Sequence, residues 1–469
     1  MMNFSAVLKI LIGLVVVLVA CFIYTFDFET KPLSLEARIY VDSTTEIPLD
    51  EMSAWNPKRK IAIYAQDSVG IKSYKIKATT QDGLVVYDKE EIVLNKPKSI
   101  KFWLPKPEVA LPNRTKLHYQ ISVTDWSNAN FFSGNTITKH FELTINTKTP
   151  VINVIANSNR ISYGGSALLV FQVKSVDIKE IQISNGKQFF TPFQFIKDGY
   201  YAVILAWPIG NPQFTGTISI TDTALNTQKI TIPFVRDNSV RYANATIQLK
   251  DDFLDSKMDS LMQDIHHTYP SHITNNFDKF KYINETIRLD DEKTITKAMI
   301  ENPYLDFGLD SWGMWRAFAP LKGYVVVGKF GEKRTYIASD KQKSQSVHLG
   351  LDMASIKNDQ IIATNRGKVI LQQQLGVYGR TLLLYHGFGL STLYSHLEHF
   401  YTTLHQDIAS GDILGLTGQS GWAFGDHLHF GVYVQGLSVK NSEWMDQKWV
   451  KNNVLDVFEK AKKLIELQQ

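Results

Sequence analysis

The chain has 469 residues, a formal net charge of +4 and 44% hydrophobic residues. A charge this small, with no basic run in the sequence, gives no reason to expect nucleic-acid binding. The composition is that of a globular protein without a low-complexity tract, which excludes a disordered or collagen-like chain.

The first predicted element is an apolar helix near the start of the chain. Residues Ile10 to Phe26 are almost wholly apolar, with Lys9 just before them and Asp27 just after. At ~1.5 Å per residue such a helix reaches about 25 Å, the short end of a membrane span. The basic residue before the segment and the acid behind it favour an amino-terminus-in orientation. We therefore expect a transmembrane helix within a membrane anchor over residues 1–28, with the remainder of the chain outside the cytoplasm.

Two alternatives stay open for this segment. One is a secretory signal that is cleaved from the mature protein. The other is a lipoprotein signal, because Leu18-Val19-Ala20-Cys21 resembles a bacterial lipobox. Phe22 continues the apolar run where a lipoprotein would turn polar, which favours the anchor. Cys21 is the only cysteine, so the exported part has no disulfide and must rely on core burial.

The next part of the chain is β-rich and contains a repeated sequence motif. Tyr74, Ile76 and Ala78 alternate with polar residues, and so do the apolar residues between Leu117 and Val123. The motif Ile-Ser-Val-Thr-Asp at 121–125 returns about a hundred residues later as Ile-Ser-Ile-Thr-Asp at 218–222. The repeat predicts two immunoglobulin-like β-sandwich domains, over 29–148 and 149–237. Neither carries a metal or nucleophile pattern, so spacer or partner-binding roles are expected.

Residues 238–310 are predicted to form a partly helical linker. Leu254, Met258, Leu261 and Ile265 follow helical spacing, with acidic residues near the start of the run. The interpretation we prefer is a helix packed on a neighbouring domain. A regulatory element close to the catalytic cleft is the alternative.

Two short motifs carry most of the chemical information. His348 and Asp352 lie four residues apart, and His427 and His429 lie two apart. In an extended segment these spacings place each pair on one face. Two facing strands would then offer three imidazoles and one carboxylate to a common point, and both groups are zinc ligands. A catalytic zinc takes three protein ligands, which leaves one histidine beside it for proton transfer.

Other chemistries lack their motifs. The sequence has no His-Glu-x-x-His, no Gly-x-Ser-x-Gly, no P-loop and no Rossmann glycine fingerprint. Serine and cysteine nucleophiles are therefore not expected. Of the twelve histidines, seven lie between 348 and 429. His386 is left open between support of the metal site and a structural role. The other histidines are expected to be exposed or structural: His118, His140, His266, His267, His272, His399 and His405.

The motifs resemble those of a known family. Further matching stretches are Phe330-Gly331 with Arg334, Gly367-x-Val369, Val377-Tyr378-Gly379, His386-Gly387-Phe388-Gly389, Tyr394-Ser395-His396-Leu397 and Gly418-Gln419-Ser420-Gly421. Together with the two histidine motifs they resemble the LytM/lysostaphin-type zinc endopeptidases, the M23 peptidase family. The likeness covers roughly residues 315–440.

The resemblance implies a fold and a site. It implies a β-rich peptidase domain over 311–442. Independently of the resemblance, Trp449, Val454, Phe458, Ala461 and Ile465 suggest a carboxy-terminal helix over 443–469 that closes the fold. The resemblance further implies that His348, Asp352 and His429 bind Zn²⁺. His396 and His427 then correspond to the two catalytic histidines that do not bind the metal.

The function implied is that of a zinc metalloendopeptidase. Its substrate would be peptide bonds in the stems or cross-links of bacterial peptidoglycan, and its role cell-wall remodelling. Its place would be the bacterial cell envelope, as a single-pass inner-membrane protein with the catalytic domain in the periplasm. Its expected partners are peptidoglycan, the inner membrane and proteins bound by the β-sandwich domains, with no nucleic acid. The alternative is a non-enzymatic LytM-like regulator that activates cell-wall amidases, against which the retention of all five polar site residues argues. A structural scaffold role for the β domains is compatible with either.

Overall fold

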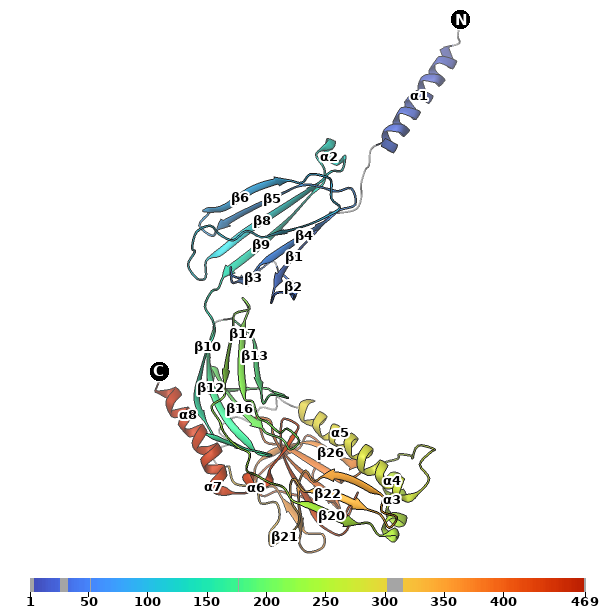
Figure 1. Ribbon diagram of the computed structural model, residues 1–469, viewed down its shortest axis with the longest axis vertical. Helices are drawn as coiled ribbons and strands as arrows, with labels where there is room; N and C mark the ends of the chain where they lie inside the picture. Colours follow the sequence, from blue (N-terminus) through green and yellow to red (C-terminus); the bar gives the residue numbers. More distant parts are fainter. Residues whose placement is uncertain (1–3, 26–32, 51, 176, 302–314, 468–469) are drawn as a thin grey trace. The chain divides into compact units, whose positions relative to one another are not determined.

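The protein is mainly β, with few helices, and forms two compact units (Figure 1). The computed structural model describes residues 4–25, 33–50, 52–175, 177–301 and 315–467. Unit 1 comprises Met1–Pro150 together with Ser175–Glu180 and Thr221–Gln228, and unit 2 comprises the remainder. The expected anchor segment forms helix α1, Phe4–Thr25. Within the described ranges no helix combines the length and apolar character that a membrane crossing needs, so the expected transmembrane anchor is not supported.

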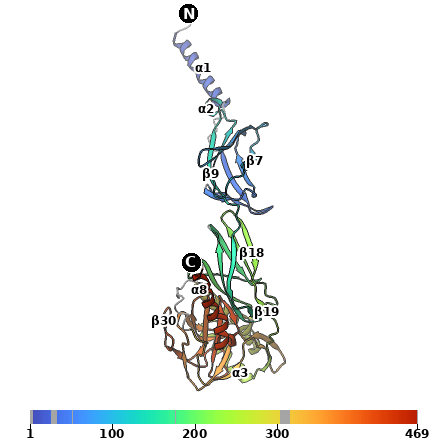
Figure 2. The ribbon, with the colours of Figure 1, turned by 90° about the vertical axis from the view of Figure 1, so that its left-hand side faces the viewer.

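Unit 1 contains a sandwich of two mainly antiparallel sheets. One sheet has the order β2-β1-β4-β7 and the other β3-β9-β8-β5-β6. Figure 2 shows β7 and β9 on opposite sides of this sandwich. The elements are β1 Ser34–Tyr40, β2 Glu46–Pro48, β3 Met52–Trp55, β4 Ile61–Gln66, β5 Ile71–Thr80, β6 Val85–Ile92, β7 Ser99–Trp103, β8 Lys116–Asp125, α2 Ala129–Phe132 and β9 Thr136–Ile145.

The two alternating segments predicted as strands are confirmed. They are β5 and β8, which pair antiparallel with Ile76 opposite Ile121. Every second side chain of β8, from Leu117 to Val123, is buried between the two sheets. The alternation therefore reflects a strand with one face on the core and one face in water.

Residues 151–237 form a second set of sheets, most of which belongs to unit 2. Their orders are β10-β12-β16-β15, β14-β13-β17-β18 and β11-β19. The second copy of the repeated motif lies in β17 and buries Ile218 and Ile220, as β8 buries Ile121 and Val123. The strands are β10 Val151–Asn157, β11 Arg160–Ser162, β12 Ser166–Lys174, β13 Ile178–Ser184, β14 Phe189–Phe190, β15 Phe193–Phe195, β16 Lys197–Ala206, β17 Thr217–Asp222, β18 Thr227–Thr231 and β19 Val235–Asp237.

The stretch expected to be a linker is built into the sheets and the core of the carboxy-terminal part. Strand β20, Asn244–Gln248, pairs in parallel with β22, Lys333–Ile337. The helix predicted from the spacing of Leu254 is α3, and its buried residues share a core with Leu375, Tyr378 and Trp422. The helices that follow pack on the same sheets, next to β23 and β26. The helical elements are α3 Asp251–Asp264, α4 Asn276–Tyr282, the π-helical turn η1 Ile283–Ile287 and α5 Arg288–Glu301.

The carboxy-terminal part is organised around an eight-stranded sheet. Its order is β21-β24-β32-β28-β27-β26-β30, with β33 paired to β32. Two three-stranded sheets, β20-β22-β23 and β25-β31-β29, flank it. The strands are β21 Val325–Gly328, β23 Lys343–Val347, β24 Leu351–Ala354, β25 Gln360–Ile362, β26 Gly367–Leu375, β27 Gly379–Tyr385, β28 Leu390–Leu397, β29 His399–Phe400, β30 Asp407–Ile408, β31 Ile413–Leu416, β32 Leu428–Val434 and β33 Leu437–Val439.

The chain ends in helices that pack on the second sandwich. The expected carboxy-terminal helix is α8, Asp456–Glu466, and the ring of Phe458 stacks on Phe195 of β15 at 5.3 Å. The helices before it are α6 Asn441–Trp444, α7 Gln447–Val450 and the π-helical turn η3 Lys451–Leu455. Trp444 is fully buried and donates a hydrogen bond to Ser166 Oγ at 2.9 Å. These helices thus connect the eight-stranded sheet to the sheet β10-β12-β16-β15.

Candidate metal centre and catalytic cleft

Three neighbouring strands of the eight-stranded sheet position the candidate site. β24 pairs with β32 so that Asp352 lies opposite His429, and β32 pairs with β28 so that His429 lies opposite Ser395. His396 follows Ser395 directly. The register of the sheet therefore places Asp352, His429 and His396 side by side, although they are far apart in the sequence.

Three ligand atoms converge at one point. His348 Nε2 lies 2.9 Å from Asp352 Oδ1 and 3.0 Å from His429 Nδ1, and His429 Nδ1 lies 2.8 Å from Asp352 Oδ1. Their residues form the one group among the described parts of the chain that brings three metal-ligating side chains together. All three side chains are buried.

The chemistry of these donors fits zinc. Nδ1 of His348 lies 2.9 Å from the carbonyl oxygen of Lys329, which can only accept, so the ring proton is on Nδ1 and Nε2 carries a lone pair. That lone pair points at a carboxylate oxygen and at a second imidazole. Electron pairs that face one another at such distances are stabilised by a cation, and two imidazoles with one carboxylate are a zinc ligand set.

His348 does not share a strand with Asp352, and the expectation that it does is wrong. His348 follows β23, whereas Asp352 lies in β24, and the chain passes from one sheet to another between them. Gly350 makes the turn possible, because a Cβ atom there would lie 2.5 Å from Nε2 and Cε1 of His429. The i, i+4 spacing thus brings the two ligands together through a turn that needs glycine.

His427 likewise lies outside a regular strand. It precedes β32 and forms an isolated bridge with Gly418, while His429 lies within β32. Its Nε2 is 3.8 Å from Asp352 Oδ1. The expectation that His427 and His429 share one strand is therefore wrong, because β32 begins one residue after His427. Both side chains nevertheless reach the site.

Arg334 supports the carboxylate from behind. Its Nη2 donates to Asp352 Oδ2 at 3.0 Å, and its Nε donates to Glu332 at 3.2 Å. Gly328 leaves room for this contact, because a Cβ there would lie 2.3 Å from Asp352 Oδ2. Burial would raise the pKa of Asp352, but the facing histidines His348 and His429 hold it well below its usual value. The carboxyl group is therefore ionised, as a metal ligand must be.

A bulge aims His396 at the site. The pairing of β27 with β28 shifts register between Arg380 and Leu382, and His396 has a left-handed backbone with φ of 64°. A non-glycine residue in this conformation carries strain, which is common at functional sites. The His396 ring lies 4.7 Å from His427 and 5.8 Å from His429. Burial, followed by the neighbouring histidines, lowers the pKa of His396 well below its usual value.

The two histidines outside the ligand triad are held in the same way. His396 Nδ1 donates to the carbonyl of Ser420 at 2.9 Å, and His427 Nδ1 donates to the carbonyl of Gly425 at 2.8 Å. A proton fixed on Nδ1 leaves Nε2 of each neutral ring as the acceptor. The pair can therefore accept a proton, or deliver one once charged, beside the ligand triad.

His386, which directly follows β27, is held by a backbone carbonyl and an aromatic ring. Its Nδ1 donates to the carbonyl of Arg366 at 2.7 Å, and its ring packs edge-on against Trp315 at 5.4 Å. Burial lowers the pKa of His386 to about 4, so the ring is neutral. His386 does not line the candidate cleft.

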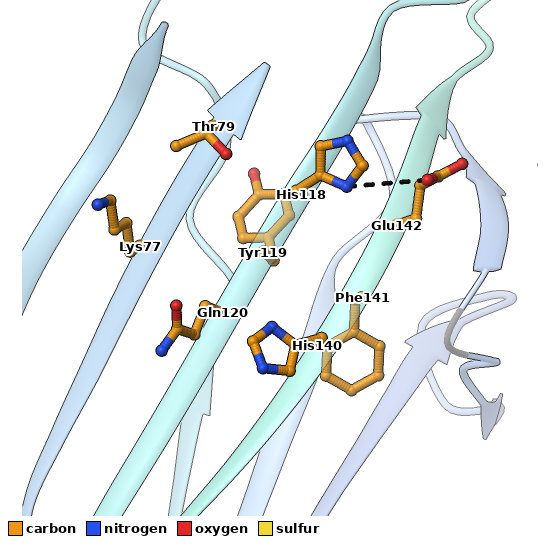
Figure 3. Close-up of a pocket in the computed structure, with 8 residues that line it drawn as sticks. All are labelled: Lys77, Thr79, His118, Tyr119, Gln120, His140, Phe141 and Glu142. Atoms are coloured by element: carbon orange, nitrogen blue, oxygen red, sulfur yellow. Dashed lines mark ion pairs between the residues drawn. The ribbon is translucent and has the colours of Figure 1, made fainter. Parts of the chain in front are cut away.

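The remaining histidines lie away from the site. His266, His267, His272, His399 and His405 are exposed. His118 and His140 line a separate pocket of about 380 Å³ on the sheet of unit 1, beside Lys77 and Gln120 (Figure 3). There His118 Nδ1 faces Glu142 at 3.8 Å.

A cleft of about 490 Å³ opens over the ligand triad, and residues outside the motif region form part of its wall. Ile247 of β20 and Arg288 of α5 line it together with Trp422 and Phe424. Phe253 of α3 stacks on Phe424 at 4.6 Å. Sequence reasoning missed these upstream residues, because no spacing links them to the histidine motifs.

The fold and the site can now be compared with known proteins. Residues 346–441, about a fifth of the chain, match the model of Peptidase family M23.

Known relatives share this domain. The chain is 29% identical over 93 residues to the DD-carboxypeptidase/endopeptidase Mpg of Neisseria meningitidis, which covers 20% of this chain and 21% of the relative. It is 32% identical over 92 residues to the peptidoglycan DD-endopeptidase ShyB of Vibrio cholerae, covering 20% and 22%. The match thus spans about a fifth of the curated relatives' length. Among solved structures, a putative M23 peptidase from Pseudomonas aeruginosa is 18% identical, with a TM-score of 0.37, and covers 62% of this chain and 96% of that one.

Proposed function

We propose that this chain is a zinc-dependent endopeptidase that hydrolyses peptide bonds in the stems or cross-links of bacterial peptidoglycan. The observation that carries the proposal is the convergence of three ligand atoms within 3.0 Å of one another, beside two histidines with their Nδ1 protons tied to backbone carbonyls. The family match and the similarity to the peptidoglycan DD-endopeptidase ShyB support the choice of cell-wall peptides as substrate.

The roles of the site residues follow from this geometry. His348 Nε2, Asp352 Oδ1 and His429 Nδ1 would hold the ion. Zinc bound there would polarise the scissile carbonyl and lower the pKa of a water molecule.

His396 and His427 would supply the remaining catalytic chemistry. One Nε2 would accept the proton of the attacking water and pass it to the leaving amine. The other ring, once protonated on Nε2, would donate a hydrogen bond to the carbonyl oxygen as negative charge develops there. Arg334 keeps Asp352 oriented throughout.

The proposal locates the protein in the bacterial envelope, where peptidoglycan lies. Attachment to the inner membrane, expected from residues 10–26, has no support from the described helices. The β-sandwich domains are proposed to act as spacers or docking surfaces for protein partners.

Metal analysis combined with a peptidoglycan digest tests the proposal. The zinc-loaded protein should release peptide fragments from purified peptidoglycan, with new amino and carboxyl ends seen by mass spectrometry. His348→Ala, Asp352→Ala and His429→Ala should each lose zinc and all release, because three ligands leave no redundancy. His399→Ala, an exposed histidine outside the cleft, is the matched control and should behave as the wild type.

The same digest separates the enzyme from a regulator. A zinc-loaded protein that releases nothing alone, but increases release by an added cell-wall amidase, would favour the non-enzymatic function. Full zinc content in all three ligand variants would refute the ligand assignment.

A further inference from the structure

The cleft contains an arginine that no motif singles out. Arg288 is the first residue of α5, and it lines the same cleft as the ligand triad although it lies outside residues 346–441. The other arginine of the cleft, Arg334, is committed to Asp352 and Glu332. Within the described parts of the chain no carboxylate forms an ion pair with Arg288, since none lies within 4.0 Å of its nitrogens.

Arg288 is held in place by neutral groups. Its Nε and Nη2 donate to Asn284 Oδ1 at 3.2 and 3.0 Å. Asn284 is buried and is itself fixed, because its Nδ2 donates to Ser344 Oγ at 2.9 Å and to the carbonyl of Gln345 at 3.1 Å. The guanidinium carbon lies 5.8 Å from the centroid of the Trp422 ring. The edge of the guanidinium formed by Nε and Nη2 is thus occupied. The other edge, formed by Nη1 and the second N–H of Nη2, is left for a ligand.

Two acidic side chains on the same helix, Asp291 and Glu292, interact electrostatically with the Arg288 guanidinium but form no ion pair with it. Asp291 uses both carboxylate oxygens on the backbone N–H groups of Gly376 and Val377, at 2.9 and 2.7 Å. Glu292 is partly buried, and burial raises its pKa. Neither forms an ion pair with Arg288, so the guanidinium keeps its capacity to bind an anion.

We propose that Arg288 binds a carboxylate of the peptide that occupies the cleft, with Trp422 supporting the apolar part of the same residue. A planar guanidinium with one free edge matches a carboxylate with two parallel hydrogen bonds. The preferred substrate is therefore an acidic peptide that carries a free carboxylate near the scissile bond, on the α5 side of the cleft. Arg288 is a substrate-binding residue and contributes specificity rather than chemistry. The inference rests on the proposed peptidase function.

Two matched substrates test this role. One is a synthetic cross-linked stem-peptide dimer with free carboxyl groups, and the other is the same compound with those groups converted to amides. The wild type should cleave the acidic form with a kcat/KM about 10- to 100-fold higher, as expected for a charge-assisted pair. Arg288→Gln should remove this preference through KM, so that the acidic form is cleaved no faster than the amide form. Arg288→Lys should retain part of it, because an ammonium is a point charge without the fork.

Controls separate binding from folding. Lys297→Gln removes the same charge from the same helix at a side chain that is 71% exposed, and it should change neither substrate. Zinc content of Arg288→Gln should equal that of the wild type. An equal loss of kcat/KM on both substrates in Arg288→Gln would assign Arg288 a structural role and overturn the inference. An unchanged preference for the acidic form in this variant would overturn it as well.

A binding measurement keeps the inference independent of turnover. Calorimetric titration of the zinc-loaded protein with the two peptides should show tighter binding of the acidic form, which Arg288→Gln abolishes. If this preference is found but neither peptide is cleaved, the carboxylate site stands and the proposed hydrolytic function fails. Equal binding of both peptides by the wild type would overturn the carboxylate site.

Discussion

The carboxylate of Asp291 in α5 accepts the backbone N–H of Val377 at 2.7 Å, and its other oxygen accepts that of Gly376 at 2.9 Å. Val377 precedes Tyr378, whose ring lies 5.4 Å from the ring of His429. A helix outside residues 346–441 therefore fixes the backbone beside the candidate metal centre. The helices before that segment support the site as well as cover the sheet.

Replacing Asp291 should destabilise this wall of the cleft. Asp291→Ala leaves two buried N–H donors without an acceptor, which costs about 2–4 kcal/mol. Asp291→Asn keeps one acceptor and should lose about half as much. Denaturant unfolding measures the loss, and kcat/KM should fall with it because Tyr378 shifts. Asp290→Ala, at a neighbouring exposed side chain, is the control. Equal stability of the Asp290 and Asp291 variants would contradict the supporting role.

Arg334 should control how tightly the metal is held. Arg334→Gln removes the donor to Asp352 Oδ2, so the carboxylate is free to rotate away from the two imidazoles. Loss of a group that orients a metal ligand typically lowers affinity about 10- to 100-fold. Competition with a chelator for zinc measures the change. Arg316→Gln, at an exposed residue, should bind zinc as the wild type does. An unaltered affinity in Arg334→Gln would show that Asp352 is held by its other contacts.

His396 and His427 should separate catalysis from metal binding. His396→Ala and His427→Ala should keep most of the zinc, since neither supplies a ligand atom to the triad. Each should lower kcat by about 10²-fold or more, because proton transfer and charge stabilisation contribute that much. Metal analysis checks that zinc is retained, and single-turnover digestion measures the loss of rate. His405→Ala is the exposed control. A near-normal rate in either variant would remove that residue from the mechanism.

Glu443 should make unit 2 sensitive to pH. Its carboxylate is buried in α6 and accepts the N–H of Ser166 in the second sandwich at 3.1 Å. Burial raises the pKa of Glu443 from 4.5 to about 7, so the folded state holds the proton more tightly than the unfolded state. The contribution of about 3 kcal/mol is complete below pH 4.5 and is lost as the pH rises through about 7.

Glu443→Gln tests this sign. The amide resembles the protonated carboxyl group and does not titrate, so the variant should gain stability relative to the wild type between pH 5 and pH 8. Calorimetric unfolding of both proteins across this range measures the gain. A constant difference at every pH would show that Glu443 does not titrate in this way.

The sequence predicts the local parts of this molecule better than its long-range connections. Apolar and polar residues alternate over Tyr74–Ala78, and apolar residues follow helical spacing from Leu254. Each pattern reflects one strand or one helix that buries a single face, so both elements could be predicted. The two histidine motifs come together in the structure, while the roles of their residues stay predictions. The turn through Gly350 could not be predicted, because it depends on the close approach of His429 from a distant strand.

Contacts that join distant segments leave no trace in local spacing. Nothing in the sequence connects Arg288 with Trp422, or Asp291 with Gly376, since each pair is formed only when α5 packs beside β26. The expected anchor is not supported, for a different reason. Its prediction relied on apolar length, and the described helices do not meet the requirement for a membrane crossing.

The parallel pairing of β20 with β22 has a consequence for how such a domain could be exchanged between genes. Residues 244–248 form the edge of the sheet β20-β22-β23, about a hundred residues before the family segment begins at 346. A recombination joint placed at 301 would remove this edge strand and leave the backbone of β22 open to pairing with other chains. A joint at 346 would remove β22 and most of β23 as well. Selection against aggregation would therefore favour joints upstream of residue 244, so that an exchanged unit includes β20 as well as the segment that carries the ligands.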